Sequence, residues 1–240
     1  MPLWSISACE QAGVPLLYVG NFTWTELYRE FLPEQIWEAY AAEYRKIRHG
    51  MLYALHNPEM LEFLSQAELS ETSLVARPFH PDEIQAIRAR HTCPVVFVAL
   101  GMSAQFTQPV SVEGVNAHFY VTEGVPLTGS NVTVIPYSTL HTQDYVAAAD
   151  YVITKAGWGT VAECLLAQKP MALFARDSVL EDRTTIRLLE QKKLAIKVTY
   201  EQLTEMSDLL EQMKQITYPA VPEYDNAAAE IVSKLLTLTE

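Results

Sequence analysis

The chain has 240 residues, of which 49% are hydrophobic, enough apolar material for one large packed domain or two modest ones. Its formal net charge of −12 and pI near 4.9 argue against partners such as nucleic acid or anionic membranes, which bind clustered Lys and Arg. The three cysteines lack C-x-x-C spacing and the six histidines are scattered, so the sequence predicts neither a disulfide framework nor a metal site and favours a reducing, cytoplasmic setting.

The first third of the chain predicts an α/β domain that the sequence enters partway. The expected elements are a helix that Gly13 ends, a strand at 16–19, a helix at 33–48, a strand at 51–55, a short strand at 74–76, and a helix from Pro81 to about Arg90. We place a domain boundary near His91, which divides the chain into residues 1–91 and 92–240.

A loop at residues 21–24 follows the first predicted strand, at the end where α/β proteins place ligands. Asn21, Thr23 and Trp24 are therefore candidates for a ligand or interdomain contact. An aromatic cluster that simply covers the edge of the sheet explains the same residues equally well.

The second part opens with a buried strand at 94–100 that ends in glycine and serine, as in the first loop of a doubly wound domain. Gly101 and Ser103 are candidate diphosphate contacts, or part of a plain turn between strand and helix. The strands expected after them lie at 117–121, 132–135, 151–154, 171–175 and 194–198, and a loop joins the first two. The expected helices lie at 142–148, 160–167, 201–215 and 226–236. A further long helix follows the loop at 176–183 and runs through Lys192.

The stretch from Tyr151 to Pro170 contains the strongest sign of a ligand site. An apolar run breaks at Gly157 and Gly159, on either side of Trp158, and helical spacing resumes at Thr160. Such glycines let the backbone approach a ligand closely, and the unpaired N–H groups of the following helix attract phosphate. A mere chain reversal would use glycines in the same way.

Three side chains could complete such a phosphate cradle. Thr160 could cap the helix or bind a phosphate oxygen, Lys155 adds a cation, and Glu163 lies one turn into the helix, where a carboxylate could hold a ribose diol.

The ten residues from Thr154 to Glu163, followed by Lys169-Pro170, an apolar strand and Glu181-Asp182-Arg183, resemble the donor-binding half of GT-B glycosyltransferases. With Asp144 to Asp150 in front, the stretch is similar to the glycosyltransferase-like domain at the front of L-arabinokinases and in related stand-alone proteins. The segments at 12–15, 21–24 and 74–78, together with Tyr28, resemble the acceptor-side domain of the same group. The resemblance implies an α/β fold of two Rossmann-like domains of GT-B type, the N-terminal one incomplete.

The resemblance also implies roles for particular residues. Asp182 or Glu181 would bond hydroxyls of the donor sugar, although both acids would also favour any helix N-terminus. Tyr137 would meet the nucleobase, and the last helix would cross back onto the first domain. The donor would be a nucleotide sugar of the UDP type, bound as a substrate and with no cofactor.

The catalytic base has no assignment, because relatives take it from a glycine-rich loop of the N-terminal domain that has no match here. His141 lies near the predicted pocket as a loop or cap residue, or as a base. Three explanations are open: the sequence is a fragment, a second polypeptide or self-association completes the N-terminal domain, or the chain is a remnant that binds nucleotide sugars without transferring them. Two functions stay open: a hexosyl- or N-acetylhexosaminyl-type glycosyltransferase, and a non-catalytic or regulatory module that binds nucleotide sugars. Hydrolase and kinase motifs are absent, and no stretch resembles a transmembrane helix or a signal peptide.

Overall fold

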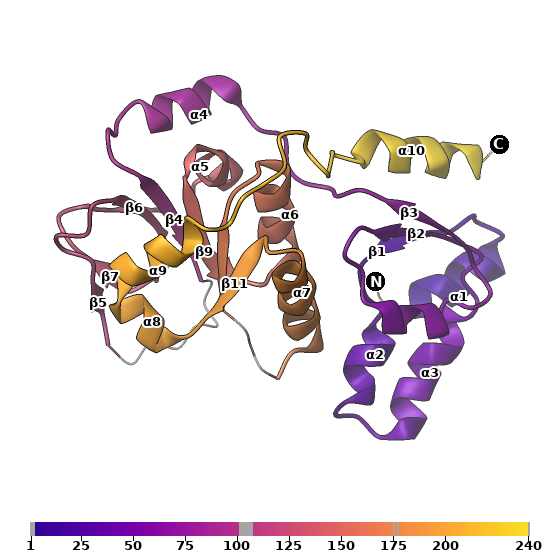
Figure 1. Ribbon diagram of the computed structural model, residues 1–240. Coiled ribbons are helices and arrows are strands. Elements are labelled where there is room, and N and C mark those ends of the chain that lie inside the picture. Colours follow the sequence, from indigo (N-terminus) through magenta and orange to yellow (C-terminus); the bar gives the residue numbers. More distant parts are fainter. Residues whose placement is uncertain (1–2, 101–107, 175, 177, 240) are drawn as a thin grey trace.

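The computed structural model describes residues 3–100, 108–174, 176 and 178–239, which form an α/β structure around two parallel sheets (Figure 1). Its helices are α1 (Leu3–Ala12), α2 (Trp24–Arg29), α3 (Glu34–Tyr44), η1 (Pro58–Glu62), α4 (Pro81–Arg88), α5 (Thr142–Ala148), α6 (Trp158–Leu166), α7 (Leu180–Gln191), α8 (Tyr200–Thr204), α9 (Met206–Met213) and α10 (Ala228–Thr237). Its strands are β1 (Leu17–Gly20), β2 (His49–Tyr53), β3 (Glu68–Thr72), β4 (Val95–Ala99), β5 (Val110–Ser111), β6 (His118–Thr122), β7 (Leu127–Thr128), β8 (Val132–Ile135), β9 (Tyr151–Lys155), β10 (Met171–Phe174) and β11 (Ala195–Val198). Within these ranges no helix is long and apolar enough to cross a bilayer.

The N-terminal sheet has three parallel strands in the order β1-β2-β3. The predicted strand at 74–76 is wrong: the third strand is β3, and Leu74 forms only an isolated bridge with Asn226. The reason is compositional, because the sequence of β3, Glu-Leu-Ser-Glu-Thr, is polar and mostly exposed and so carries no apolar signal. The predicted helix before Gly13 and the strands near 16–19 and 51–55 are confirmed.

Gly20, the last residue of β1, is fixed by a close approach. The Tyr18 hydroxyl crosses over it to donate to the carbonyl oxygen of Phe22, 2.5 Å away. A Cβ on residue 20 would lie 2.6 Å from that hydroxyl oxygen, so any larger residue would displace the tyrosine. Tyr18 thereby sets the course of the loop that leaves β1.

The C-terminal sheet has six parallel strands in the order β11-β10-β9-β4-β6-β8. From β4 the chain adds strands on one side and then returns to add β9, β10 and β11 on the other, which is the order of a Rossmann fold. All the strands predicted for this half are present, with no boundary shifted by more than one residue. The expected loop between β6 and β8 is confirmed, and it carries the short strand β7, which pairs with β5.

Two hydrophobic cores cover the two faces of this sheet. Phe97 and Val152 point toward α5, α6 and α7, whereas Val98 and Ile153 point toward α8 and α9. The alternation follows from the two-residue period of a strand, and both sets are buried because helices cover both faces. The single helix predicted at 201–215 is wrong: α8 and α9 meet at Glu205, whose backbone (φ −107°, ψ 50°) is not helical.

The chain crosses twice between the two sheets, once after β3 and once after α9 (Figure 1). The two crossings touch: Leu74 N donates to Asp225 O at 3.3 Å, Ala227 N donates to Leu74 O at 2.8 Å, and Asn226 Nδ2 donates to Ala76 O at 2.8 Å. Beyond the second crossing, α10 lies beside the N-terminal sheet, where Thr72 Oγ1 donates to Glu230 Oε2 at 2.7 Å.

Candidate functional site

The candidate site lies at the carboxyl ends of β4 and β9, the neighbouring strands between which the strand order reverses. Ligands of doubly wound folds bind in the crevice outside such a pair of strands. The turn between β9 and α6 lies at this edge of the sheet. The predicted contacts Gly101 and Ser103 follow β4 in the sequence and lie outside the described residues.

The turn after β9 presents unpaired backbone donors. Gly157 is the N-cap of α6, and its carbonyl oxygen accepts from Val161 N at 3.1 Å. The amides of Trp158, Gly159 and Thr160 have no hydrogen-bond acceptor among the residues that the structure describes. The alternative that Thr160 caps the helix is wrong, because Thr160 is the third helical residue and its backbone donor is itself free.

The two glycines of the turn differ in their surroundings. A Cβ on Gly157 would lie 3.2 Å from Lys155 Cε, so the aliphatic part of that lysine packs against the turn. A Cβ on Gly159 would meet nothing within 4 Å. Residue 159 has no crowded neighbour and no left-handed backbone that would require glycine, and glycine inside a helix costs about 1 kcal/mol relative to alanine. Close approach by a ligand to the backbone would explain why residue 159 is glycine.

Lys155 and Glu181 bring opposite charges to the edge of the turn. The Lys155 ammonium forms no salt bridge within the described part of the chain. Burial raises the pKa of the Glu181 carboxyl, and the nearby Asp182 raises it further, whereas Arg176 and Lys155 oppose the shift. Lys155 is therefore a cation available to a bound anion.

Glu163 is only 4% exposed and lies in a network that joins three segments. Its Oε1 accepts from Arg77 Nε at 2.8 Å, and the same guanidinium donates to Leu140 O at 3.1 Å and to Thr142 Oγ1 at 2.9 Å. The second carboxylate oxygen, Oε2, has no hydrogen bond among the described residues. Sequence reasoning gave Arg77 no role; its only signal was its place in the segment at 74–78.

Asp182, at the start of α7, is fully buried and already paired. Its carboxylate accepts from Arg176 Nε at 2.8 Å, from Arg176 Nη2 at 2.7 Å and from the Arg176 backbone amide at 3.1 Å. This arrangement binds the loop after β10 to the first turn of α7. Glu181, the other candidate for the sugar contact, is less buried.

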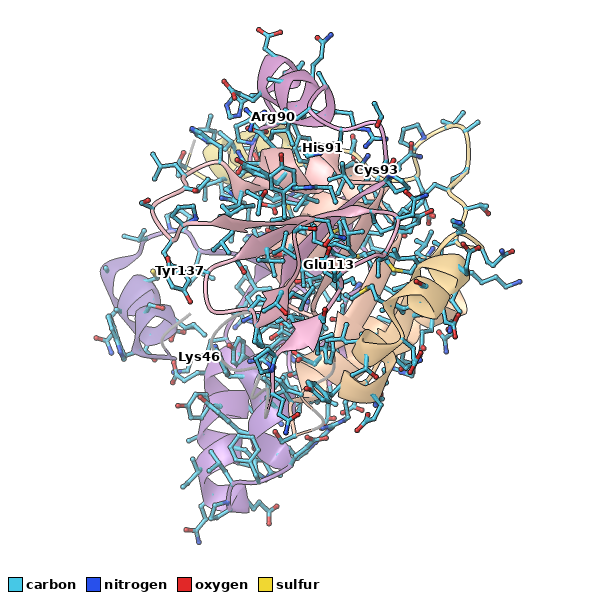
Figure 2. The ribbon with its side chains drawn as sticks, turned by 90° about the vertical axis from the view of Figure 1, so that its left-hand side faces the viewer. Lys46, Arg90, His91, Cys93, Glu113 and Tyr137 are labelled. Atoms are coloured by element: carbon cyan, nitrogen blue, oxygen red, sulfur yellow. The ribbon has the colours of Figure 1, made fainter. Side chains whose placement is uncertain are left out.

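Tyr137 is not brought to the turn by any hydrogen bond or ring contact within the described ranges. Its side chain is 64% exposed on the loop after β8, and its backbone amide donates to Glu123 Oε2 at 3.2 Å. Figure 2 shows the side chain at the surface of the molecule. A role at the nucleobase stays a prediction. His141, the other loop candidate, is the N-cap of α5 and makes no capping bond.

The N-terminal sheet reaches the turn through one aromatic pair. The rings of Tyr53, at the end of β2, and Trp158, the first residue of α6, stack with centroids 5.7 Å apart and planes 24° apart. Trp158 Nε1 is buried without a partner among the described residues. Asn21, at the end of β1, lines a groove that Tyr53 also lines. The structure therefore connects the predicted acceptor-side and donor-side residues.

Comparisons with known proteins agree with this geometry. The glycosyltransferase family 28 C-terminal domain matches residues 84–238. Among curated proteins, none matches the sequence significantly.

Solved structures of low sequence identity share the fold. The spinosyn forosaminyltransferase SpnP matches with a TM-score of 0.64 at 13% identity, over 100% of this chain and 74% of its own. UGT89C1 of Arabidopsis thaliana, complexed with UDP-L-rhamnose, gives a TM-score of 0.61 at 13% identity over 99% of this chain and 65% of its own. UGT73P12 of Glycyrrhiza uralensis gives 0.60 at 12% identity over 99% and 72%. The GT-B-like α/β fold is thereby confirmed.

Proposed function

Because the chain belongs to the glycosyltransferase family 28 C-terminal domain family, we propose that it binds a UDP-type nucleotide sugar at the turn between β9 and α6 and transfers the sugar to an acceptor. The observation that carries this proposal is the set of three free amides at Trp158, Gly159 and Thr160, placed where the strand order reverses. A match to a structure complexed with UDP-L-rhamnose supports the choice of nucleotide.

The geometry suits the charge that develops during transfer. When the bond between the sugar and the diphosphate breaks, negative charge grows on the phosphate oxygens, and prearranged donors stabilise it without reorganising. The amides of α6 are such donors, and Lys155 adds an unpaired cation. Glu163 has an unengaged carboxylate oxygen for a ribose hydroxyl. Gly101 and Ser103, which follow β4 in the sequence, would add contacts to the diphosphate.

The donor sugar would lie toward the start of α7. Glu181 is the more accessible of the two acids there, because Asp182 is held by Arg176. Asp182 would contact the sugar directly once Arg176 releases its carboxylate on ligand binding. We expect the transferred sugar to be a hexosyl or N-acetylhexosaminyl group. The kinship to the front domain of L-arabinokinases belongs to the same proposal and rests on the stretch from Asp144 to Glu163.

We assign residues 1–91 to an acceptor-side domain and 92–240 to the donor-binding domain. The edge of β1 has no strand partner among the described residues, so a strand from further sequence, from a second polypeptide or from a second copy could extend the sheet there. A non-catalytic module that binds nucleotide sugars is the second candidate, favoured by the lack of an assigned base.

Binding of UDP to the wild-type protein and to Gly159→Ala tests the proposal by calorimetry. The variant should fold at least as stably, because alanine favours helix and its Cβ meets open space. Its affinity for UDP should fall at least tenfold, since that methyl group occupies the approach of the phosphates. Uridine, which lacks phosphate, should bind both proteins equally weakly.

Failure of the wild-type protein to bind UDP or any other nucleoside diphosphate would refute both candidate functions. UDP affinity unchanged in Gly159→Ala would move the phosphates away from this turn. UDP release from UDP-glucose or UDP-N-acetylglucosamine in the presence of an acceptor supports the transferase, whereas tight binding without turnover favours the binding module.

A further inference from the structure

A pocket of about 420 Å³ lies at the amino ends of the first two strands of the N-terminal sheet. Three parts of the chain line it: α1 with the segment that leads into β1, the residues that lead from α3 into β2, and the end of α10. Small-molecule sites usually have volumes of about 300–1,000 Å³, so the pocket is large enough for a ligand.

This pocket and the proposed donor site lie at opposite ends of one strand. His49, the first residue of β2, lines the pocket, whereas Tyr53, the last, stacks on Trp158. The rise per residue of a strand places the two ends about 13 Å apart. No residue within β1 lines the pocket, so its walls do not depend on the free edge of that strand. A ligand here would therefore lie outside the crevice where donor and acceptor would meet.

The deep part of the pocket is apolar. Ile6 and Ile47 are 3% and 2% exposed and belong to the core of the N-terminal unit, and Leu16 packs against that core. Leu238 adds a further aliphatic side chain from the end of α10. Such walls favour a ligand with an apolar body, because burying it removes apolar surface from water.

The contribution of Leu238 is notable because α10 is otherwise poorly packed. The helix buries none of its residues, and Val232 and Leu236 are 55% and 57% exposed. Its side-chain bond to the N-terminal sheet lies at the other end of the helix, where Thr72 donates to Glu230. A ligand held between Leu238 and α1 would therefore fix the free end of α10 to the N-terminal unit.

The rim of the pocket carries an excess of positive charge. Among its described residues are two cations, Lys46 and Arg48, and one acid, Glu10. The whole chain has 29 acidic and 17 basic residues, so this excess is a local departure from its composition. Such a rim favours an anionic group on the ligand.

The two cations differ in what they already bind. Lys46 Nζ donates to Ser7 Oγ at 2.7 Å and to Glu43 Oε1 at 2.5 Å, and Glu10 Oε2 lies 4.0 Å away. Arg48 is exposed, and its guanidinium forms no hydrogen bond or salt bridge with any residue that the structure describes. Because a guanidinium presents parallel N–H groups that match a carboxylate, Arg48 is the group that can receive one.

We propose that this pocket binds a small organic carboxylate with an apolar body. The carboxylate pairs with Arg48, and the body lies against Ile6, Leu16 and Leu238. Acids with an acyl chain and acids with an aromatic ring share this chemistry. The site is separate from the proposed donor site and does not rest on the proposed function.

Calorimetry with matched probes tests the inference on the full chain. Octanoate represents the acyl-chain acids and phenylbutyrate the aromatic acids, and the tighter of the two identifies the source. Octanol lacks the charge of octanoate, octylammonium reverses it, and acetate lacks the apolar body. We expect the better acid to bind at least about tenfold more tightly than each of these three, since a hydrogen bond to a charged group is worth that factor.

Two substitutions assign the binding to this pocket. Arg48→Ala should lower the affinity for the better acid about tenfold and leave that for octanol unchanged. Leu238→Ala should weaken both, and it should also reduce the slowing of hydrogen exchange that the acid causes in α10. Arg45→Ala is the matched control, because Arg45 pairs with Glu38 and is not among the lining residues. Arg48→Gln replaces Arg48→Ala if the latter fails to fold.

Each remaining outcome overturns the inference. Equal affinity for the acid in Arg48→Ala, octylammonium binding as tight as octanoate, or no binding of either acid would each refute the site. Displacement of the acid by UDP would place it in the donor crevice, which refutes this inference and leaves the proposed function standing. Self-association that Leu238→Ala abolishes would show that a second copy fills the pocket. Acid binding without UDP binding refutes only the proposed function.

Discussion

At the scale of single residues, the pairing of Glu163 with Arg77 decides how the carboxylate can act. A buried carboxylate without a partner is costly. The guanidinium bonds one oxygen and is itself fixed by Leu140 O and Thr142 Oγ1, so it fixes the orientation of the other oxygen. Arg77 is thus a positioning residue for the proposed ribose contact.

Arg77→Ala should therefore reduce the preference for ribose over deoxyribose. Wild-type protein should bind UDP more tightly than 2′-deoxy-UDP by about 1–3 kcal/mol, the worth of a hydrogen bond to a charged group. In Arg77→Ala, and in Glu163→Gln, most of that difference should vanish in calorimetric titrations.

Arg29→Ala is the matched control, because Arg29 also pairs with carboxylates, those of Glu59 and Glu62, but on the N-terminal unit. An undiminished ribose preference in a folded Arg77→Ala protein would exclude the positioning role.

At the scale of elements, the N-terminus of α2 contains a carboxyl group that makes folding stability depend on pH. Glu26 closes a capping box: its Oε1 accepts from Thr23 N at 2.6 Å, and its Oε2 accepts from the Thr23 hydroxyl. The residue is 1% exposed, and burial raises its pKa to about 6, against hydrogen bonds that lower it. The folded state therefore binds this proton more tightly than the unfolded state.

The sign of the pH effect follows from that difference. Between about pH 4.5 and pH 6 the native state holds more protons at Glu26 than the unfolded state, so this residue's contribution to stability falls as the pH rises through that window. The loss amounts to about 2 kcal/mol, at 1.36 kcal/mol per pKa unit.

Glu26→Gln should keep the cap geometry and remove this dependence. Urea denaturation at pH 4.5 and pH 7 gives the unfolding free energy of both proteins. Relative to wild type, the variant should be about 1–2 kcal/mol more stable at pH 7 than at pH 4.5. Glu10→Gln, an exposed change on α1, should show no such shift. A constant difference for Glu26→Gln would mean that Glu26 titrates normally.

Elements with a strong local signal were predictable from the sequence. The buried strands of the C-terminal sheet are continuous apolar runs, and α5 occupies the predicted residues 142–148. β3 was missed because its side chains are polar, and the break between α8 and α9 because the apolar period continues through Glu205. Packing against neighbouring elements, which local pattern does not encode, decides such cases.

The candidate site also contains features that the sequence predicted and features that it did not. The turn at Gly157 and Gly159 was visible as a strand, two glycines and a helix in succession. The pairing of Glu163 with Arg77 joins residues 86 positions apart, and no spacing rule reports so distant a contact. Asp182 was expected to face a sugar, yet Arg176, six residues earlier, holds its carboxylate in the described structure.

At the scale of the whole molecule, side-chain contacts join the two units near the proposed site. Arg183 of α7 pairs with Glu30 after α2, and Tyr53 stacks on Trp158. The first contact is between partly exposed charges, of a kind worth about 0–1 kcal/mol. The stack is the stronger candidate for communication, because it joins the proposed donor turn to the proposed acceptor-side domain.

Tyr53→Ala should uncouple the donor from the acceptor. In the wild-type protein, saturating UDP should change the affinity for an acceptor severalfold, within the usual coupling range of about 1–3 kcal/mol. Tyr53→Ala should reduce that factor toward one, whatever its effect on either ligand alone. Tyr40→Ala offers a matched aromatic deletion within the N-terminal unit. Coupling that persists in Tyr53→Ala would assign communication to another route.

The paired crossings between the sheets restrict how the halves can move. The two connecting segments are hydrogen-bonded to each other at Leu74, Asp225 and Ala227, so a pair of segments rather than a single one lies between the halves. A paired connection of this kind bends readily about one axis but resists sliding and swivelling, so opening and closing of the two halves would follow a single arc. A proteolytic nick in the crossing after α9 would leave the halves covalently joined, whereas a nick in the crossing after β3 would leave them joined only through the non-covalent contacts of the second crossing and α10.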